Sequence, residues 1–503
     1  MGGTRTDGRL WAICDLRMPA AREEAGRHEY DGIVQDLSPG GVKRALGALG
    51  GERYTDPHDE AHAAAAEEAL RVTFGELELH RANPMWHIQN LDLACYDRAY
   101  ASEERRREAR LAHLRAWPEA VEAAVRALDH VPAPLAVATL PAARGLGRLL
   151  PEGEEAARKA HARFVAIVES WAEHGDPSAA LGGAALARLV SSAEAQEIDL
   201  TDLAMLAEAE RGRVRALLDE ACRRVDPDAT SAETMRALLA DHPDAGHLVA
   251  EARAVTAEVV AWTAERGLVP YTDGECLVGE VPPSQPGQVA TMTVAAPYEP
   301  DGPSWFRVNP PAPSASERDR KDWLSIFSRT TLPNIAIHEV APGHFSHGRA
   351  KRRAATDVRR TLHSEGFTEG WAHYCEELAV EEGFRQGDPR HAAGVYRDAL
   401  WRVTRLACVI GLHTGAMDLA EAEHRFSADA FLDGPAARTA ARRGLTDPLS
   451  GFSYTTGKLA IRGLRDRARA AWGPRFTLPR FHAALLDLGA PPLGLLDTAL
   501  ERG

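Results

Sequence analysis

Two histidines on either side of a short turn sequence are the residues of this chain best suited to bind a metal ion. His338 and His344 open and close the heptapeptide HEVAPGH. On a regular helix, side chains six residues apart differ by about 120° around the axis and by about 9 Å along it, which is too far for one ion. Pro342 and Gly343 change this expectation, because proline lacks an N–H for the helix and glycine tolerates most backbone angles. The sequence therefore predicts a bulge at Pro342-Gly343 that brings His344 back beside His338.

A glutamate beside the first histidine suits proton transfer. Glu339 points about 100° away from His338 on the same helical turn, so it is a poor choice of second ligand. A catalytic zinc usually has three protein ligands and an open position for water, whose proton a nearby carboxylate accepts. Glu339 is therefore the predicted general base, and a third ligand must come from elsewhere in the chain.

The third ligand is predicted in the segment SEGFTEGWAHYCEE. Its acidic and histidine side chains recur at helical spacing and share one face: Glu365, Glu369, His373 and Glu376. Glu369 is the predicted ligand, because Gly370 permits close helix approach and Trp371 forms a wall beside the site. A row of carboxylates is often a solvated helix face. Here the aromatic residues, and the apolar run LPNIAI before the first histidine, indicate buried charges that need a cation.

Three nearby residues leave alternatives open. Glu365 is a spare ligand on the face of Glu369. His347 is either an exposed helix residue or a contact that supports the metal ligands. His373 is predicted to contact the substrate, and a place beside the metal is the alternative.

Composition excludes several classes of protein. The chain has 503 residues, 45% of them hydrophobic and 26% charged, as is ordinary for a globular protein. A net charge of −14, with basic clusters interleaved with acids, argues against binding to nucleic acids or membrane surfaces. Six widely spaced cysteines predict neither disulfides nor a thiolate zinc site, and neither a signal peptide nor a membrane span is visible. These features predict a cytoplasmic protein, and they predict no particular oligomeric state.

Helical periodicity dominates the chain, so the predicted fold class is mainly α. Alanine, leucine, glutamate and arginine are abundant, and apolar residues recur every three or four positions. Helices are predicted near residues 200–224, 231–266, 391–425, 435–445 and 454–473. We expect one large, elaborated helical domain over residues 1–503, with the metal-binding helices in 333–383.

Residues 267–315 differ from the rest. Prolines separate the β-prone runs ATMTVAA and SWFRVN, which predict a small sheet just before the metal-binding helix, with a long surface loop as the alternative. Trp305, Arg307 and Asn309 alternate in a predicted edge strand, where Arg307 could contact an extended peptide substrate. The same alternation would equally place Phe306 and Val308 in the core.

At these motifs the chain resembles the DUF885 family, bacterial proteins similar to zinc metallopeptidases of the HExxH-plus-glutamate group. The family pattern H-E-x-x-P-G-H, then E-G-W-A-x-Y-x-E, stands here as HEVAPGH and EGWAHYCE, and FSYTTGKLAIRGLRDRA, within 452–473, resembles a third family block. The resemblance covers most of the chain and implies a metallopeptidase-like helical domain. It also implies that His338, His344 and Glu369 bind one zinc ion, and that Glu339 is the base or acid. Tyr454 would then donate to the oxyanion.

Two cations share the helical face of Tyr454. Lys458 and Arg462 follow it at intervals of four residues. They are predicted to bind a carboxylate of the substrate, in which case Arg462 can bind it with two hydrogen bonds. The alternative is that both pair with nearby acids and only support the helix.

The sequence therefore predicts a zinc hydrolase that cleaves an amide bond in a short peptide or N-acyl amino acid with a free carboxylate. Manganese or cobalt would accept similar ligands. Two alternatives are a metal-dependent enzyme that acts on a non-peptide metabolite and a non-catalytic protein that the metal only stabilises. Glu339 argues against the last, because a structural metal site does not require a base.

Overall fold

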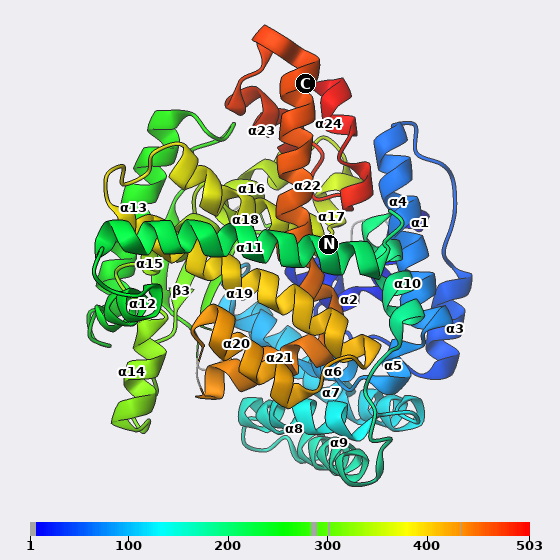
Figure 1. Ribbon diagram of the computed structural model, residues 1–503. Helices are drawn as coiled ribbons and strands as arrows, with labels where there is room; N and C mark the ends of the chain where they lie inside the picture. The colour runs from blue at the N-terminus through cyan, green and yellow to red at the C-terminus, as the bar shows by residue number, and fades with distance from the viewer. Residues whose placement is uncertain (1–6, 283–288, 300–301, 433) are drawn as a thin grey trace.

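The computed structural model describes residues 7–282, 289–299, 302–432 and 434–503, which form mainly helices and one small sheet, as the sequence predicts (Figure 1). Helix α19 (Pro389–Thr414) buries side chains along most of its length. It contacts α11 (Leu200–Val225), which crosses the front of the molecule in Figure 1, and also α18 (Glu365–Glu381) and α22 (Pro448–Trp472). The predicted metal-binding segment therefore packs among long central helices.

Glycines allow α18 and α22 to approach each other closely. A Cβ atom added at Gly457 of α22 would lie 2.0 Å from the carbonyl oxygen of Gly366 and 2.6 Å from the Cα atom of Gly370. Such contacts are sterically forbidden, so the interface requires glycine at Gly457. Gly370 permits close helix approach, as the sequence predicts.

Replacing Gly457 with alanine is expected to lower the free energy of unfolding by about 1–3 kcal/mol, the usual effect of an extra methyl group in a packed interface. Thermal unfolding followed by circular dichroism measures the change. Gly463 is the matched control, because in the same helix its added Cβ would meet only the end of the Arg467 side chain, at 3.7 Å. Gly463→Ala should stabilise slightly, since alanine is the better helix former. Equal effects of the two substitutions would contradict the close packing.

Two of the predicted helices are each divided in two. Residues 231–266 form α12 (Ser231–Ala240) and α13 (Leu248–Arg266), with Pro243 in the turn between them. Residues 391–425 form most of α19 and part of α20 (Leu419–Ala430), because Gly415 takes a left-handed conformation (φ 75°) that ends the first helix. Apolar periodicity continues across such short breaks and does not reveal them.

The sheet differs in part from the prediction. The two predicted runs pair antiparallel as β2 (Ala290–Thr293) and β3 (Ser304–Val308), and the unpredicted strand β1 (Cys276–Glu280) pairs parallel with β3. The central strand is β3, so the prediction that Trp305, Arg307 and Asn309 lie on an edge strand is wrong. Alternation along β3 identifies its buried face but not the order of the strands. Parts of the predicted segment, 283–288 and 300–301, lie outside the described residues.

Segments from the first hundred residues lie beside the sheet. Helix α2 (Met18–Glu23) and the 3-10 turn η3 (Ala94–Asp97) approach the chain that follows β2. The Tyr298 N–H donates to the carbonyl of Ala25 at 3.1 Å, and Arg98 pairs with Glu299. Residues far apart in the sequence therefore form one wall. In the part of the chain that the structure describes, no helix is long and apolar enough to span a bilayer.

Candidate metal centre

The motif HEVAPGH spans a break between two helices. Helix α15 (Leu332–Glu339) ends at Glu339, and α16 (His344–Arg352) begins at His344. A Cβ atom at Gly343 would lie 1.9 Å from the carbonyl oxygen of His338, so only glycine fits this turn. The helix is thus interrupted at the predicted place, but by a turn between two helices rather than a bulge within one.

The turn brings both histidines to Glu369 of α18. The ring centroids of His338 and His344 lie 4.7 Å apart, and their Nε2 atoms lie 3.3 and 3.4 Å from Glu369 Oε2. Ligand atoms about 3.4 Å apart suit a tetrahedral ion with bonds of about 2.1 Å. Glu369 Oε2 is buried and accepts no hydrogen bond of normal geometry from a described residue. The two nitrogen donors and one oxygen donor, which we call the triad, therefore fit a zinc ion with a position left for water.

A buried glutamate orients the first histidine of the triad. Glu376 Oε1 accepts a hydrogen bond from His338 Nδ1 at 2.6 Å and lies 2.8 Å from Arg402, while Asn334 donates to its other oxygen at 3.1 Å. Burial opposes ionisation of Glu376, but Arg402 and the neighbouring histidines outweigh it and hold the pKa of Glu376 well below its usual range. The ionised carboxylate holds a proton on His338 Nδ1, which would leave the lone pair of Nε2 available to a metal ion.

His373 contacts Glu376 and is closed off from solvent. Its side chain is fully buried, and its Nδ1 lies 3.3 Å from Glu376 Oε2. Burial lowers the pKa of His373 to about 3, so the ring is neutral. This position corrects the predicted substrate contact, because spacing on the face of Glu369 does not show which part of that face other helices cover.

The structure also shows where His347 and Glu365 lie. His347 lines the cavity beside the triad, but it is buried and its Nε2 lies 3.1 Å from the carbonyl oxygen of Gly489. Glu365 lines the same cavity one helical turn from Glu369, and its side chain is exposed. Among the described residues, the donor atoms of the triad lie within 4.8 Å of one another, and neither His347 nor Glu365 belongs to this group.

Glu339 and Tyr454 flank the triad. Burial raises the pKa of Glu339, and the two histidines of the triad partly offset this shift. The Tyr454 ring lies 6.0 Å from the His338 ring and is nearly parallel to it, at 17°. Burial and the charge of Glu369 raise the pKa of Tyr454 to about 12, so its hydroxyl stays protonated and able to donate.

Lys458 and Arg462 are engaged by acidic residues. Lys458 is 1% exposed, and its Nζ lies 2.6 Å from Glu210 and also contacts Glu377. Arg462 Nη1 lies 3.0 Å from the same Glu377. These contacts favour the alternative in which both cations pair with nearby acids, and they correct the prediction that the two residues bind a substrate carboxylate.

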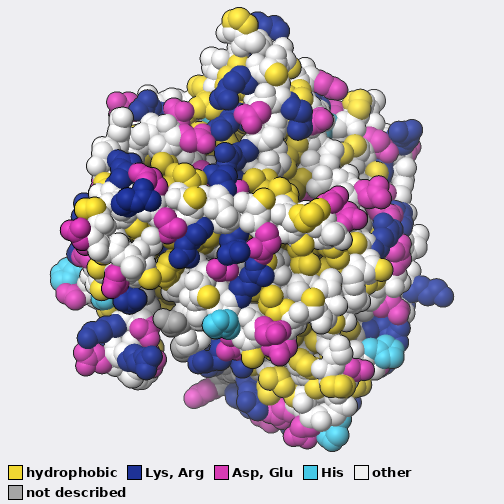
Figure 2. All heavy atoms as spheres, viewed as in Figure 1, with side chains coloured by type: hydrophobic (Ala, Val, Ile, Leu, Met, Phe, Trp, Pro, Cys, Tyr) yellow, Lys and Arg dark blue, Asp and Glu magenta, His cyan; other side chains and the backbone are white. Residues whose placement is uncertain are grey.

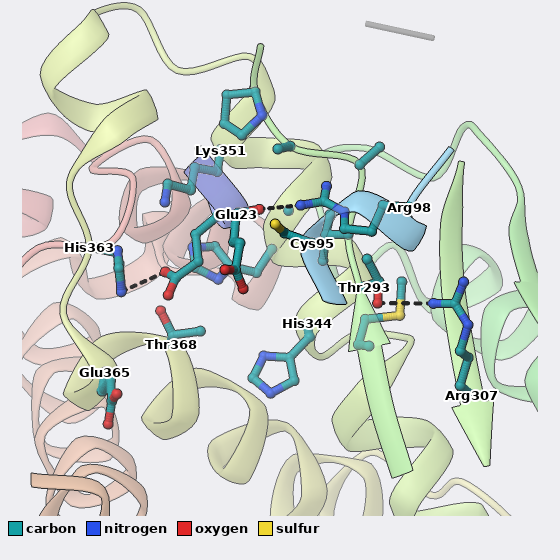
Figure 3. Close-up of a pocket in the computed structure, with 18 of the residues that line it drawn as sticks. Glu23, Cys95, Arg98, Thr293, Arg307, His344, Lys351, His363, Glu365 and Thr368 are labelled. Atoms are coloured by element: carbon teal, nitrogen blue, oxygen red, sulfur yellow. Dashed lines mark hydrogen bonds and ion pairs between the residues drawn. The ribbon is translucent and has the colours of Figure 1, made fainter. Parts of the chain in front are cut away.

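A cavity of about 390 Å³ opens at the triad (Figure 3). Its walls come from α16, α18, β2 and the N-terminal segments α2 and η3. Arg307 lines it as well, donating to Thr293 Oγ1 at 3.0 Å, and Figure 3 shows this pair on the strands to one side of His344. The predicted Arg307 therefore lies at the cavity, on the central strand.

Sequence reasoning missed most of the charged residues of the cavity. They come from separate elements, including α21 (Gly434–Thr446): Glu23, Glu24, Asp97, Arg98, Lys351, His363 and Arg443. Spacing from His344 could have revealed Lys351, since seven residues correspond to nearly two full helical turns. The others had no local signal, because the tertiary fold alone brings them together.

Comparisons with known proteins identify a family and a fold. The family model described as "Bacterial protein of unknown function (DUF885)" matches residues 19–500. A "putative lipoprotein of unknown function" from Shewanella oneidensis has a TM-score of 0.78 and 17% identity, over 97% of this chain and 96% of that one. A "putative lipoprotein" from Colwellia psychrerythraea has a TM-score of 0.75 and 16% identity, over 98% and 96%. No curated protein matches the chain.

The predicted cytoplasmic location is contradicted by these structural relatives, because both are described as a "putative lipoprotein". The prediction relied in part on the absence of paired cysteines, and all six cysteines are indeed free. Five of the six are buried, however, and only Cys276 is partly accessible. A buried thiol stays unpaired in either redox environment, so free cysteines do not identify a reducing compartment here.

Proposed function

We propose that this chain, which belongs to the DUF885 family of bacterial proteins, is a zinc-dependent hydrolase that cleaves an amide bond in a short peptide. The observation that carries the proposal is the triad: two Nε2 atoms 3.3 and 3.4 Å from one carboxylate oxygen, at the wall of a cavity. Structural zinc sites usually have four protein ligands, whereas catalytic sites have three and an open position. Three donors beside a cavity therefore favour catalysis.

The residues around the triad have the chemistry for amide hydrolysis. When bound, zinc supplies a Lewis acid that activates water. The amide C–N bond breaks as the water adds its hydroxyl to the carbonyl carbon and a proton to the nitrogen. Glu339 takes up that proton and returns it to the leaving amine. Tyr454 donates from its protonated hydroxyl to the oxygen on which negative charge develops.

The edge of the sheet favours a peptide over a non-peptide substrate. Among the strands that the structure describes, β2 pairs with β3 alone, and its residues Met292 and Thr293 line the cavity. An extended peptide can add to a free strand edge through backbone hydrogen bonds. A peptide is therefore favoured as substrate over a specialised metabolite.

Metal analysis of the purified protein tests the proposal. After incubation with zinc and removal of excess ion, wild type is expected to contain about one zinc per chain by plasma mass spectrometry. His338→Ala, His344→Ala and Glu369→Ala should each lose it, whereas Glu339→Gln should keep it because Glu339 is not a ligand. Parallel loading with manganese and cobalt shows which ion the donors prefer. Wild type that binds none of the three ions would rule the proposal out.

A further inference from the structure

The cavity has a second charged end, nearly two helical turns from the triad. Lys351 follows His344 by seven residues in α16, which corresponds to about 10.5 Å along the helix axis and about 20° around it. Both side chains therefore leave the helix in nearly the same direction, and both line the cavity. Figure 3 shows them apart in this space, with His344 toward the bottom of the view and Lys351 toward the top.

Lys351 is a buried cation without a direct ion-pair partner among the described residues. The residue is 7% exposed, and among the residues that the structure describes none forms a hydrogen bond or ion pair with it. Burial lowers the pKa of Lys351 to about 8, and the charge of Glu24 partly opposes this shift. An ammonium group buried without a counter-ion is energetically costly, so a ligand that brings an anion to it gains binding free energy.

The acidic residues nearby leave room for such an anion. Glu24 lies 2.6 Å from His363 Nε2, and Figure 3 shows His363 to one side of the cavity. Glu23 Oε1 lies 3.6 Å from Arg22 Nη2, which balances part of its charge. Arg98 lines the same wall, where it pairs with Glu299. The environment of Lys351 therefore does not exclude a carboxylate.

We infer that Lys351 binds the free C-terminal carboxylate of the peptide that is hydrolysed at the triad, an inference that rests on the proposed function. The rise along α16 from His344 to Lys351 is about 10.5 Å. An extended chain covers about 3.3–3.6 Å per residue, so this rise corresponds to two or three residues of substrate. The cleaved bond is therefore the second or third from the C-terminus, and the products released are dipeptides or tripeptides. Pairing with the edge of β2 would hold this stretch extended.

Alanine peptides of two to six residues test this assignment, each prepared as the free acid and as the C-terminal amide. The zinc-loaded protein should hydrolyse the acid with a kcat/KM about 10- to 100-fold above that of the amide, the worth of one charge-assisted hydrogen bond. Mass spectrometry should find dialanine or trialanine as the C-terminal product. Lys351→Met should abolish the preference, and Lys351→Arg should retain most of it. Lys321→Met is the matched control, because Lys321 is exposed and pairs with Glu317.

Binding separates this inference from the proposed function. The same peptides are titrated calorimetrically into zinc-loaded Glu339→Gln protein, with and without Lys351→Met, so that affinity is measured without turnover. A preference for the acid that depends on Lys351 supports the carboxylate site even if wild type hydrolyses no peptide. Zinc-dependent hydrolysis of acid and amide at equal rates would overturn the site and leave the hydrolase standing. A preference that survives Lys351→Met, or no binding of any peptide, would also overturn it.

Discussion

Replacing Glu339 with glutamine is expected to lower kcat for peptide hydrolysis by about 10²- to 10⁴-fold, the usual contribution of a general base. Glutamine has nearly the same shape but cannot accept the proton, and the three ligands of the triad are unchanged. Burial raises the pKa of Glu339 toward the range in which a base works best near neutral pH. Steady-state rates and zinc content should be measured on the same samples.

Glu365→Gln is the matched control for this substitution. Glu365 lines the cavity one turn from Glu369, so the change removes another carboxyl group near the triad and leaves the three ligands intact. We expect a much smaller decrease in kcat, because Glu365 lies outside the group of donor atoms. Equal decreases in the two variants, or loss of zinc from Glu339→Gln, would contradict the role of Glu339 as base.

The triad could be predicted from the sequence because its signals are local. Proline and glycine inside HEVAPGH interrupt a helix wherever they stand, and the return of His344 to His338 follows from that interruption. The choice of Glu369 depended on Gly370, whose lack of a side chain permits the contact with Gly457. The sequence did not distinguish a bulge from two separate helices, because the same proline and glycine are compatible with both.

The partners of Lys458 and Arg462 could not be predicted in the same way. Helical spacing correctly placed Lys458 and Arg462 on one face, but not the acids that face them. Because α18 and α22 lie side by side, Glu377, two turns beyond Glu369, meets both cations. Strand order had the same limitation, since pairing partners decide which strand is at the edge. The sequence shows that Lys351 follows His344 by seven residues. Only the structure shows that both side chains line one cavity.

Replacing Lys458 with methionine is expected to lower the free energy of unfolding at neutral pH by about 3–5 kcal/mol, the usual result of removing one partner from a buried ion pair. Lys458 is 1% exposed and lies between Glu210 and Glu377. Arg213 contacts both acids and still balances part of their negative charge in the variant, so we expect a loss at the lower end of this range. Urea unfolding at pH 7 measures the change. Lys321→Met, at an exposed pair, should change stability by less than about 1 kcal/mol.

The same comparison at lower pH separates charge from packing. Burial opposes ionisation of Glu377, but Lys458 and Arg213 lower its pKa from 4.5 to about 2. The unfolded chain therefore binds more protons than the folded protein between these values, and the stabilisation is lost as the pH falls from about 4.5 toward 2. Without Lys458 the pKa of Glu377 rises toward 4.5, and the acid-dependent loss becomes smaller. The stability difference between wild type and Lys458→Met should therefore shrink on acidification. A difference that stays constant while both proteins remain folded would mean that Lys458 stabilises the helix pair through its methylene groups rather than its charge.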